Sequence, residues 1–470
     1  MYRSVLVVSC LLSLVVSGSE FSCYFNNACP FQMFGSKTPY DTGRGDLRDF
    51  KKLEGCEAVS LWSIHRHGNR NPGSSVTAAV KVIAGLKDQI VQAFDQGSSL
   101  LCATDIDEFR KWTWNETLET TPSYLTGVGY EELYGIGSRI RAAYPELLNG
   151  STEDYYFRPT NYQRTITSAM GFVHGLTDGT SLKVAIDEPR DVDDVIQPYA
   201  NCQKYQETVR DAPILDKVVA ELESSPDYAA IRHAVQKRLG IAYQITTEDV
   251  FSIYELCRFY RSWDEKKQSP WCSMFTNEEL VILDYRDDLR HYYRNGYGSW
   301  VNSRLGEQPL RDLYQKLSAA TQGQGQKIVS YFSHDAMMEM VYCALQLFND
   351  REPLRGDNRN PDRLWRTSYI GAMAINMITV LNRCQESGTE AYRVQIFVGE
   401  KVTELCPVEG CSWEEFEHMF KQFNDTNLNF CALDYPEPED PMPCCLPDSA
   451  AVHSISWVVL LLLIGISRFW

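Results

Sequence analysis

The sequence has no surplus of positive charge. Its 62 acidic residues outnumber its 45 lysines and arginines, so the 470-residue chain carries a formal net charge of -17 at pH 7. Proteins that bind nucleic acids or anionic membrane surfaces use spare cations to displace counterions, so this composition argues against both classes of partner. An anionic ligand of this chain must therefore meet a local cluster of cations.

The sequence also lacks the patterns of a metal site. Cys406-x4-Cys411 and Cys444-Cys445 do not form two paired CxxC elements, and no histidine pairs with them at ligand spacing. Aspartates do not cluster at metal-binding spacing either. We therefore predict that the protein uses neither a metal nor a cofactor. Repeats of solenoid period are also missing.

Apolar runs at the two ends of the chain are typical of processing signals. Arg3 precedes the apolar residues 5–16, and the small residues 17–19 follow, which predicts a secretory signal peptide over residues 1–19. Removing Cys10 with this peptide leaves 14 of the 15 cysteines, an even number that suits disulfides in an oxidising compartment. Three Asn-x-Ser/Thr sequences then predict glycosylation, at Asn115, Asn149 and Asn424.

The C-terminal apolar run, residues 455–466, is shorter than the roughly 20 residues that cross a bilayer. Small residues precede it, so we predict a GPI-type signal over residues 450–470 with Ser449 as the candidate attachment site. A plain membrane anchor is the alternative, because the polar spacer is shorter than this rule prefers. Residues 433–449 are acidic and proline-rich, which favours a stalk. We expect the mature protein at the cell surface, held by a lipid anchor, or secreted.

A strand, a loop and a helix follow one another early in the chain. Glu57–His65 is rich in β-branched and aromatic residues and ends at a glycine-containing loop, which predicts a buried strand. Apolar spacing predicts a helix over Ser75–Phe94 and a second amphipathic helix over residues 125–148. A strand followed by a loop and a helix is the unit of α/β folds.

Residues 185–297 are mostly helical in pattern, charged and aromatic, which we interpret as a helical cap inserted into the fold. Strand character returns after this block in three segments, Ile328–Phe332, Ala372–Leu381 and Tyr392–Val398. We therefore predict an α/β domain built from both parts of the chain, residues 20–184 and 298–432.

The segment SIHRHGNRNP, residues 63–72, concentrates positive charge where the first strand ends. Loops at the carboxyl ends of parallel strands bind ligands in open α/β sheets. Arg66 and Arg70 can hold a phosphate or carboxylate by charge-assisted bonds, and His67 between them can act as a nucleophile. Taken alone, however, such a triplet is more often a solvated basic turn.

A second strand-to-helix junction carries His334 and Asp335, within KIVSYFSHDAMMEMVYCALQLF at residues 327–348. Alone, Asp335 is best explained as an N-cap or first-turn acid that the helix dipole stabilises. Two such junctions that meet at one edge of the sheet supply a nucleophile, an acid and an anion clamp together.

These segments resemble a known signature. RHGNRNP is similar to the Arg-His-Gly-x-Arg-x-Pro motif of the histidine acid phosphatases, and His334-Asp335 resembles their downstream His-Asp pair. LTGVGYEELYGIGSRIRAAYP, residues 125–145, is similar to their Leu-Thr-x-x-Gly helix. The resemblance spans about residues 30–420. Three shorter segments resemble the multiple inositol polyphosphate phosphatase branch: FGSKTPY (34–40), SPWC (269–272) and NGYGSWVNSR (295–304).

The resemblance implies a fold and a role for each residue. The fold would be a phosphoglycerate-mutase-like, three-layer α/β sheet domain with an inserted helical cap. His67 would form a phosphohistidine, and Asp335 would protonate the leaving alkoxide, which needs an acid. The transferred phosphate would be held by Arg66, Arg70, Arg164 and His334. Without the family register, Arg164 would be a solvated or salt-bridged surface residue.

Physical chemistry is consistent with these roles. Three arginines and a histidine supply the charge neutralisation that phosphoryl transfer needs without a metal. Asp335 must be protonated to act as an acid, which favours acidic pH unless burial raises its pKa. The nitrogen of His67 that attacks is left open by the sequence.

The chain departs from the branch at one position. The branch usually reads His-Ala-Glu, whereas this chain reads His334-Asp335-Ala336, the form of the broader acid phosphatase and phytase group. Glu339 lies one helical turn beyond Asp335, and we expect it to be exposed or to cap the helix rather than to act in catalysis. Asp335 remains the expected proton donor.

Three functional hypotheses follow. The first is an extracellular phosphatase that acts on phytate, on lower inositol phosphates and, by extension, on 2,3-bisphosphoglycerate. The second is a broad-specificity histidine acid phosphatase. The third is a surface protein of weak activity that binds phosphate ligands or a partner, and the intact His67 and Asp335 argue against it. The sequence leaves the oligomeric state open.

Overall fold

The computed structural model describes most of the chain between residues 23 and 438. The predicted signal peptide, the candidate attachment site Ser449 and the C-terminal apolar run lie outside the described residues. No helix within the described part is both long and apolar enough to cross a bilayer. The described ranges are 23–25, 29–50, 52–264, 269–386 and 388–438.

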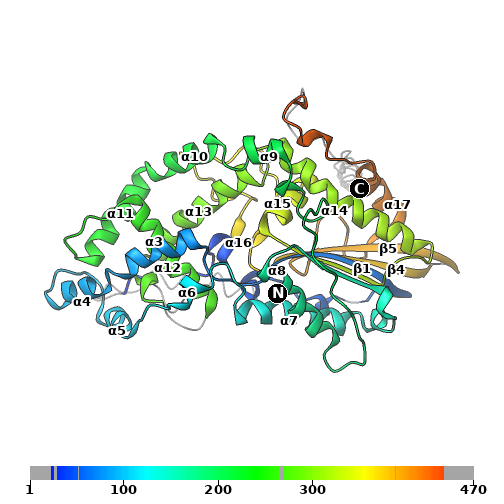
Figure 1. Ribbon diagram of the computed structural model, residues 1–470, viewed down its shortest axis with the longest axis horizontal. Coiled ribbons are helices and arrows are strands. Elements are labelled where there is room, and N and C mark those ends of the chain that lie inside the picture. The colour runs from blue at the N-terminus through cyan, green and yellow to red at the C-terminus, as the bar shows by residue number, and fades with distance from the viewer. Residues whose placement is uncertain (1–22, 26–28, 51, 265–268, 387, 439–470) are drawn as a thin grey trace, which may run out of the picture.

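One mixed sheet forms the centre of the α/β domain (Figure 1). Its strands are β1 (Cys56–Arg66), β2 (Tyr155–Pro159), β3 (Ile328–Ser333), β4 (Asn376–Glu386), β5 (Thr389–Val398), β6 (Lys401–Val402) and β7 (Cys411–Ser412). Their order is β2-β3-β1-β4-β5-β6, with β7 beside β5. β1 and β2 both run parallel to β3, whereas β4 runs antiparallel to β1. The carboxyl ends of β1, β2 and β3 therefore meet at one edge of the sheet.

The sequence of β1 suits its central position. Leu61, Trp62 and Ile64 have no solvent exposure. Because side chains alternate along a strand, Leu61 joins the core on one face of the sheet and Trp62 the core on the other. A strand that is covered on both faces needs the nearly continuous apolar run that β1 has.

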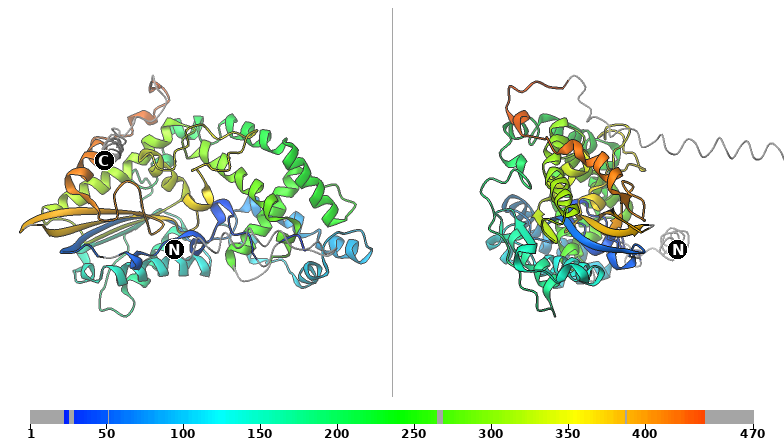
Figure 2. Two further views of the ribbon diagram at one scale, coloured as in Figure 1. Left: turned by 180° about the vertical axis from the view of Figure 1, so that it is seen from behind. Right: turned by 90° about the vertical axis from the view of Figure 1, so that its right-hand side faces the viewer.

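Helices cover both faces of the sheet and give the domain three layers (Figure 2). These helices are α7 (Gly127–Ala143), α8 (Gln163–Thr177), α14 (Trp300–Thr321), α15 (Asp335–Ala344) and α17 (Trp413–Phe420). α7 and α8 share one apolar cluster with Phe157 and Phe332, and α14, α15 and α17 share the other with Trp62 and Tyr331. The predicted three-layer α/β fold is confirmed.

Shorter helical turns connect these layers. They are η2 (Gly35–Lys37), α2 (Tyr40–Gly43), η3 (Leu47–Asp49), η4 (Pro145–Leu148), η5 (Thr152–Asp154), α16 (Thr367–Ile370), η8 (Lys421–Phe423) and η9 (Asn429–Cys431). η2 and α16 lie against each other near the edge where the parallel strands end. They form part of the framework around that edge.

A helical lobe lies beside the sheet domain (Figure 1). It contains α3 (Ser74–Ala84), α4 (Lys87–Asp95), α5 (Ala103–Lys111), α6 (Thr117–Thr120), η6 (Pro198–Ala200), α9 (Gln203–Thr208), α10 (Pro213–Glu223), α11 (Pro226–Leu239), α12 (Thr247–Trp263), η7 (Pro270–Met274) and α13 (Asn277–Arg294). α3 packs on α12, and α5 packs on η7. The lobe is thus built from two stretches of chain, and the predicted insertion 185–297 accounts for only the second. Helical periodicity shows that a helix has an apolar face but not which layer that face contacts.

The predicted elements agree with the structure in type and differ at their ends. Ile328–Phe332 lies within β3, and Ala372–Leu381 overlaps β4. The predicted helix Ser75–Phe94 is divided into α3 and α4 around Gly85, a residue that costs about 1 kcal/mol in a helix interior. The sequence did not predict β2, which has only five residues.

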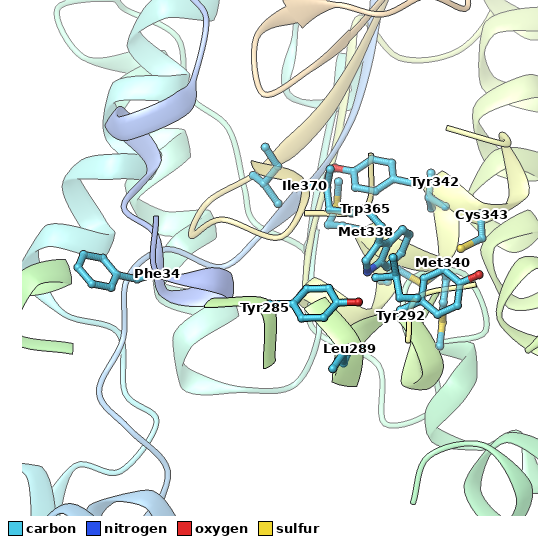
Figure 3. Packing of buried hydrophobic residues seen from close by; sticks show 14 of the residues in the cluster. Phe34, Tyr285, Leu289, Tyr292, Met338, Met340, Tyr342, Cys343, Trp365 and Ile370 are labelled. Atoms are coloured by element: carbon cyan, nitrogen blue, oxygen red, sulfur yellow. The ribbon is translucent and has the colours of Figure 1, made fainter. Parts of the chain in front are cut away.

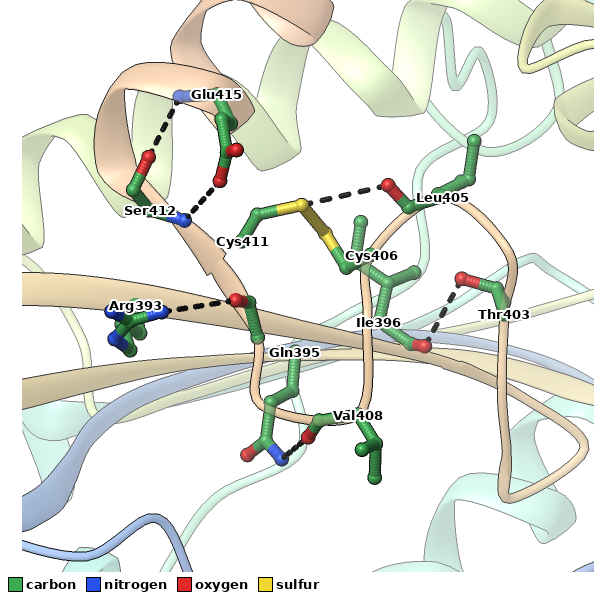
Figure 4. The surroundings of a disulfide bond; sticks show 11 residues. Arg393, Gln395, Ile396, Thr403, Leu405, Cys406, Val408, Cys411, Ser412 and Glu415 are labelled. Atoms are coloured by element: carbon green, nitrogen blue, oxygen red, sulfur yellow. Dashed lines mark hydrogen bonds between the residues drawn. A yellow bond between two sulfur atoms is a disulfide. The ribbon is translucent and has the colours of Figure 1, made fainter. Parts of the chain in front are cut away.

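Five disulfides are described, which confirms the predicted disulfide chemistry: Cys23–Cys102, Cys56–Cys384, Cys202–Cys431, Cys257–Cys272 and Cys406–Cys411. Figure 4 shows the last of them closing the loop between β6 and β7, next to the capping box of Ser412 and Glu415 that begins α17. Cys343 remains a free thiol, buried within α15, so the even number of mature cysteines does not mean that all of them pair.

The first residues of the predicted stalk contact the body of the protein. Lys204 Nζ donates to the carbonyl oxygen of Tyr435 (2.8 Å), and Trp300 Nε1 donates to Glu437 Oε2 (3.1 Å). Residues 439–449 lie outside the described residues. Within the described part, the segment that was predicted to be a stalk is therefore docked on α9 and α14.

Candidate active site

Three strand ends bring the predicted residues together. His67 follows β1, His334 and Asp335 follow β3, and Arg164 lies in the first turn of α8, shortly after β2. Arg66 ends β1 and is completely buried beside Asp335. A cavity of about 550 Å³ opens at this edge, within the usual range for a small-molecule site. It is lined by five of the six predicted residues: His67, Arg70, Arg164, His334 and Asp335.

Backbone hydrogen bonds fix His67 between two strands. Its N–H donates to the carbonyl oxygen of Ser333 (3.0 Å), and its own carbonyl accepts from the N–H of Ala374 (3.1 Å). Ring atom Nδ1 lies 2.8 Å from the carbonyl oxygen of Gly68. Because a carbonyl oxygen only accepts, Nδ1 carries the hydrogen and Nε2 keeps the free electron pair. Nε2 is therefore the ring nitrogen that could attack a substrate, a point that the sequence left open.

The surroundings of His67 keep the ring neutral. Burial lowers the pKa of His67 well below its ordinary value of 6.5, and the guanidinium groups of Arg66, Arg164 and Arg70 lower it further. A nucleophilic imidazole must be unprotonated. This histidine therefore stays in its reactive form in acidic solution, where an ordinary histidine is protonated.

Arg66 is held by backbone carbonyls and lies beside Asp335 at the cavity. Its Nη1 donates to the carbonyl oxygens of Ser36 (2.6 Å) and Gly371. Its Nη2 lies 3.0 Å from Asp335 Oδ2, an ion-pair contact that is not aligned as a hydrogen bond. Among the described residues, the buried Nε atoms of Arg66 and Arg164 have no hydrogen-bond partner. Buried donors without partners are costly, and a bound phosphate would satisfy them.

His334 positions Arg164. Nη2 of Arg164 lies 3.2 Å from His334 Nδ1, and because a guanidinium only donates, Nδ1 is the acceptor. Nε2 of His334 then donates to Thr160 Oγ1 (3.1 Å). Burial, together with Arg164, lowers the pKa of His334 to about 3. The ring is therefore neutral and holds Arg164 toward the cavity, while Arg164 also lies over the ring of Tyr162.

Asp335 is the first residue of α15, and its Oδ1 accepts from the N–H of Ala336 (2.9 Å). Burial acts to raise the pKa of Asp335, but the cations Arg66, His291 and Lys37 outweigh burial and hold this pKa well below 3.8. The carboxyl is thus ionised in the free protein. A bound polyanion would offset these cations and raise the pKa of Asp335.

The LTGVG segment holds the RHG loop in place. A Cβ at Gly68 would overlap the carbonyl group of Gly129, and a Cβ at Gly129 would overlap the carbonyl oxygen of Asn69. The N–H of Thr126 donates to the same Asn69 carbonyl (2.9 Å), and Glu132 accepts from the Asn69 N–H (2.6 Å). Two glycines therefore let α7 approach the loop closely, which explains both motifs in physical terms.

Cations from other elements complete the wall of the cavity. Six lysines and arginines line it against two aspartates, so the cavity is locally positive in a chain of net charge -17. The helical block 185–297 is charged in sequence, but the sequence assigned none of its cations to a site. Arg290 and Arg294 are four residues apart on α13 and share one face, which is the signal that sequence reasoning missed. The four cations that it did not single out are Lys37, Arg210, Arg290 and Arg294.

Glu339 differs from the expectation. The sequence predicted an exposed or capping residue, but the side chain has no solvent exposure. Its oxygens accept hydrogen bonds from His291 Nδ1 (2.8 and 2.9 Å) and from Asn295 Nδ2 (2.8 Å). α15 is buried along most of its length and packs on α14 and β1, while Glu339 meets His291 of α13 and the adjoining Asn295.

The remaining histidine of the motif has a structural role. His65 is completely buried, stacks on Phe332 at 5.2 Å and bonds Ser63 Oγ through Nε2 (2.8 Å). Among the described residues, one group has the composition of a metal site, Cys23, Cys102 and Asp105, and its two sulfurs are joined in a disulfide.

Comparison with known proteins agrees with this geometry. A model of the histidine phosphatase superfamily (branch 2) matches residues 59–398, most of the chain. The chain belongs to this superfamily. The predicted histidine acid phosphatase relationship is confirmed, and with it the prediction that the protein is a phosphoric monoester hydrolase.

The alignments with individual relatives cover most of the chain. Multiple inositol polyphosphate phosphatase 1 of Drosophila melanogaster is 28% identical over 440 residues, which cover 90% of this chain and 92% of that protein. A phytase from D. castellii has a similar solved structure, with a TM-score of 0.65, 16% identity, and coverage of 85% of this chain and 92% of that chain. A Bifidobacterium longum multiple inositol polyphosphate phosphatase, solved in complex with inositol hexasulfate, has a TM-score of 0.59, 14% identity, and coverage of 80% and 94%. At such identities the solved structures show the fold alone.

Proposed function

We propose that this protein removes phosphate groups from inositol polyphosphates, through a phosphohistidine on His67 with Asp335 as the proton donor. The observation that carries the proposal is the position of both residues at the same cation-lined cavity of about 550 Å³. The names of the relatives support the substrate class, because they include inositol polyphosphate phosphatases and a phytase.

The first half of the reaction forms the phosphohistidine. Nε2 of His67 donates its electron pair to phosphorus, the bond from phosphorus to the ester oxygen breaks, and that oxygen takes the proton of Asp335. Arg66, Arg70 and Arg164 offset the charge on the phosphoryl oxygens during transfer. Asp335 is left as a carboxylate.

The second half returns the site to its starting state. The Asp335 carboxylate takes a proton from water, the resulting hydroxide attacks phosphorus, and the bond from phosphorus to Nε2 breaks. Inorganic phosphate leaves, and the electron pair returns to His67. The hydrogen bond from Nδ1 to Gly68 keeps Nε2 directed to the cavity in both halves.

The additional cations that line the cavity favour a substrate with several phosphates. A monophosphate would be held by the three arginines near His67, whereas Lys37, Arg210, Arg290 and Arg294 line the same cavity and could bind further phosphates. By the same reasoning we include 2,3-bisphosphoglycerate as a smaller polyanionic substrate. The His334-Asp335 pair, which is the form of the broader group, favours a broad-specificity acid phosphatase as the second candidate.

One panel of assays separates the candidates. Phosphate release is measured from phytate, from 2,3-bisphosphoglycerate and from an activated aryl phosphate between pH 3 and 8. We expect turnover of phytate; turnover of the aryl phosphate alone would favour the broad acid phosphatase, and no turnover of any substrate would favour a phosphate-binding protein.

We predict that His67→Ala abolishes turnover while the thermal unfolding transition is kept, because the ring makes one hydrogen bond, to the neighbouring residue Gly68. Normal turnover by His67→Ala would rule out the phosphohistidine.

We propose that the protein acts outside the cell, with a lipid anchor. The described disulfides support an oxidising compartment. Asn115, Asn149 and Asn424 are exposed, as glycan acceptors must be. Ser449 and the terminal segments lie outside the described residues, so the anchor rests on the sequence. Release from intact cells by phosphatidylinositol-specific phospholipase C would support the anchor, and retention would favour a spanning segment.

A further inference from the structure

Glu339 and His291 form a buried pair next to the proposed proton donor. Glu339 is one helical turn beyond Asp335 on α15 and has no solvent exposure. Both of its oxygens lie within hydrogen-bond distance of His291 Nδ1 (2.8 and 2.9 Å), and Oε2 also accepts from Asn295 Nδ2 (2.8 Å). Because a carboxylate only accepts, Nδ1 of His291 carries a hydrogen. A buried carboxylate without a cation costs several kcal/mol, so this arrangement favours a positively charged His291.

His291 connects this buried carboxylate to the cavity. Its side chain is 17% exposed, against 0% for Glu339, and it lines the cavity together with Asp335. Since Nδ1 is used by Glu339, Nε2–H is the remaining polar group of the ring. Burial acts to lower the pKa of His291, but Glu339 and then Asp335 outweigh it and raise this pKa above 6.5.

Other charged groups surround His291 on several sides. α15 presents Glu339 and Asp335, and the cation of η2 lies across the same cavity. α10 also packs on α13, where Glu223 pairs with Arg286 (2.8 Å), and α16 meets α13 through Thr367 and Asp288. The charged residues that share the cavity with His291 are Lys37, Arg70, Arg164, Arg210, Asp287, Arg290, Arg294 and Asp335.

Rigid packing holds the pair at this place. Figure 3 shows Tyr285, Leu289 and Tyr292 of α13 close to Met338 and other residues of α15, around the ring of Trp365. Helices that interlock through large buried side chains resist relative movement. This packing fixes α13, which carries His291, against α15, which carries Asp335.

We propose that His291, fixed by Glu339, is a positioning residue that presents a positive charge to Asp335 and sets how readily this carboxyl gives its proton to the leaving oxygen. The inference rests on the proposed function. When the O–H bond of Asp335 breaks and the leaving oxygen gains the proton, a carboxylate forms. His291 stabilises that carboxylate electrostatically, together with Arg66, and itself neither gains nor loses a proton.

The direction of the effect follows from the charges. His291 is among the cations that hold the pKa of Asp335 well below 3.8. Removing this cation raises that pKa, so Asp335 stays protonated to higher pH. Because the protonated form is the active one, the basic limb of the rate profile must move upward. A residue that only supports the fold would lower the rate equally at every pH.

The experiment compares His291→Gln with wild type on two substrates. We expect the basic limb of the kcat profile with phytate to move upward by roughly one pH unit. The displacement should be much smaller with an activated aryl phosphate, whose leaving group needs little help from an acid. His291→Lys keeps a cation and should restore the wild-type profile. Glu339→Gln, which removes the carboxylate that favours the charged ring, should move the limb in the same direction as His291→Gln and by less.

A matched control is available in Glu400. It is also a completely buried carboxylate and pairs with Arg139 (2.6 Å), but it does not line the cavity. Glu400→Gln should lower the thermal unfolding temperature and leave the pH profile in place. Should His291→Gln fail to fold, the comparison of His291→Lys with Glu339→Gln makes the same test. An undisplaced profile in His291→Gln, or equal displacement in His291→Lys, would overturn the inference, whereas wild type without phosphatase activity would refute the proposed function instead.

Discussion

At the level of single side chains, the nucleophile and the acid place opposite demands on one electrostatic field. In the proposed reaction His67 must be neutral and Asp335 must be protonated, yet Arg66 lowers the pKa of both residues and so favours a neutral His67 and an ionised Asp335. A polyanionic substrate changes this balance. In the proposed reaction its charge would offset the surrounding cations after binding and favour protonation of Asp335.

The leaving group reveals whether Asp335 is the acid. In Asp335→Asn, the amide oxygen still accepts from the N–H of Ala336, so the start of α15 is kept. We expect the kcat for phytate to fall about 10²- to 10⁴-fold, because an inositol alkoxide leaves poorly without a proton. For an activated aryl phosphate we expect a loss under about 10-fold. Rates on both substrates are compared at one pH, and equal losses would show that Asp335 is not the acid.

Buried neutral histidines make the stability of the fold depend on pH. Burial lowers the pKa of His65 to about 3, and that of His334 is also about 3. Both are near 6.5 in an unfolded chain, so between pH 6.5 and 3 the unfolded state binds more protons and the stability falls as pH falls. Each histidine contributes a slope of about 1.4 kcal/mol per pH unit.

His65→Phe tests this linkage without touching the cavity, because the ring packs between Phe172 and Phe332. Urea unfolding at pH 4, 5, 6 and 7 measures the slope. We expect the variant to lose one histidine's share of it. A slope equal to that of wild type would mean that His65 is protonated in the folded protein or that other groups dominate.

At the scale of elements, the contact between the RHG loop and α7 fixes the position of His67, the proposed nucleophile. A methyl group at Gly129 would overlap the backbone of Asn69, two residues from His67. In Gly129→Ala the loop must move, and a displacement of about 1 Å can cost 10²-fold in rate. We expect a loss of about that size in kcat, with a moderate drop in melting temperature.

Gly127 offers the matched control for that variant. It lies two residues earlier in the same first turn of α7, and a Cβ there would meet nothing within 4 Å. Gly127→Ala should keep the wild-type kcat and slightly raise the melting temperature, since alanine is the better helix former. If both variants lost activity alike, the close approach at Gly129 would not be the cause.

The elements also show what a single sequence can and cannot predict. His67 and His334-Asp335 were predictable because each lies at the end of a strand whose local pattern is clear, and parallel strand ends share one edge. The prediction that Glu339 is exposed or caps its helix was wrong. The side chain meets His291 of α13, which is about 50 residues away along the chain. Local periodicity contains no information on such a neighbour.

At the scale of the whole molecule, the chain is acidic, but its cavity is lined by cations from both the sheet domain and the helical lobe. The sheet edge provides Arg70 and Arg164, and the helical lobe provides Arg210, Arg290 and Arg294. The net negative charge of the protein repels polyanions, while the positively charged cavity attracts them locally. The sheet edge thus holds the proposed catalytic residues, and the lobe supplies further cavity cations. The last prediction rests on this division.

Removing the lobe cations Arg290 and Arg294 should change the preference between substrates more than the rate of the chemical step. In the double variant Arg290→Ala/Arg294→Ala, the three arginines near His67 remain, so a small aryl phosphate still binds and reacts. Phytate loses charge-assisted hydrogen bonds worth about 1.5 to 3 kcal/mol each, which corresponds to a loss of about 10- to 100-fold in kcat/KM for each residue. Arg232 lies exposed on α11, away from the cavity, and Arg232→Ala is the control that should leave both substrates unaffected. Equal losses on phytate and on the aryl phosphate would place Arg290 and Arg294 in the support of the fold and would leave the preference for polyphosphates without its physical cause.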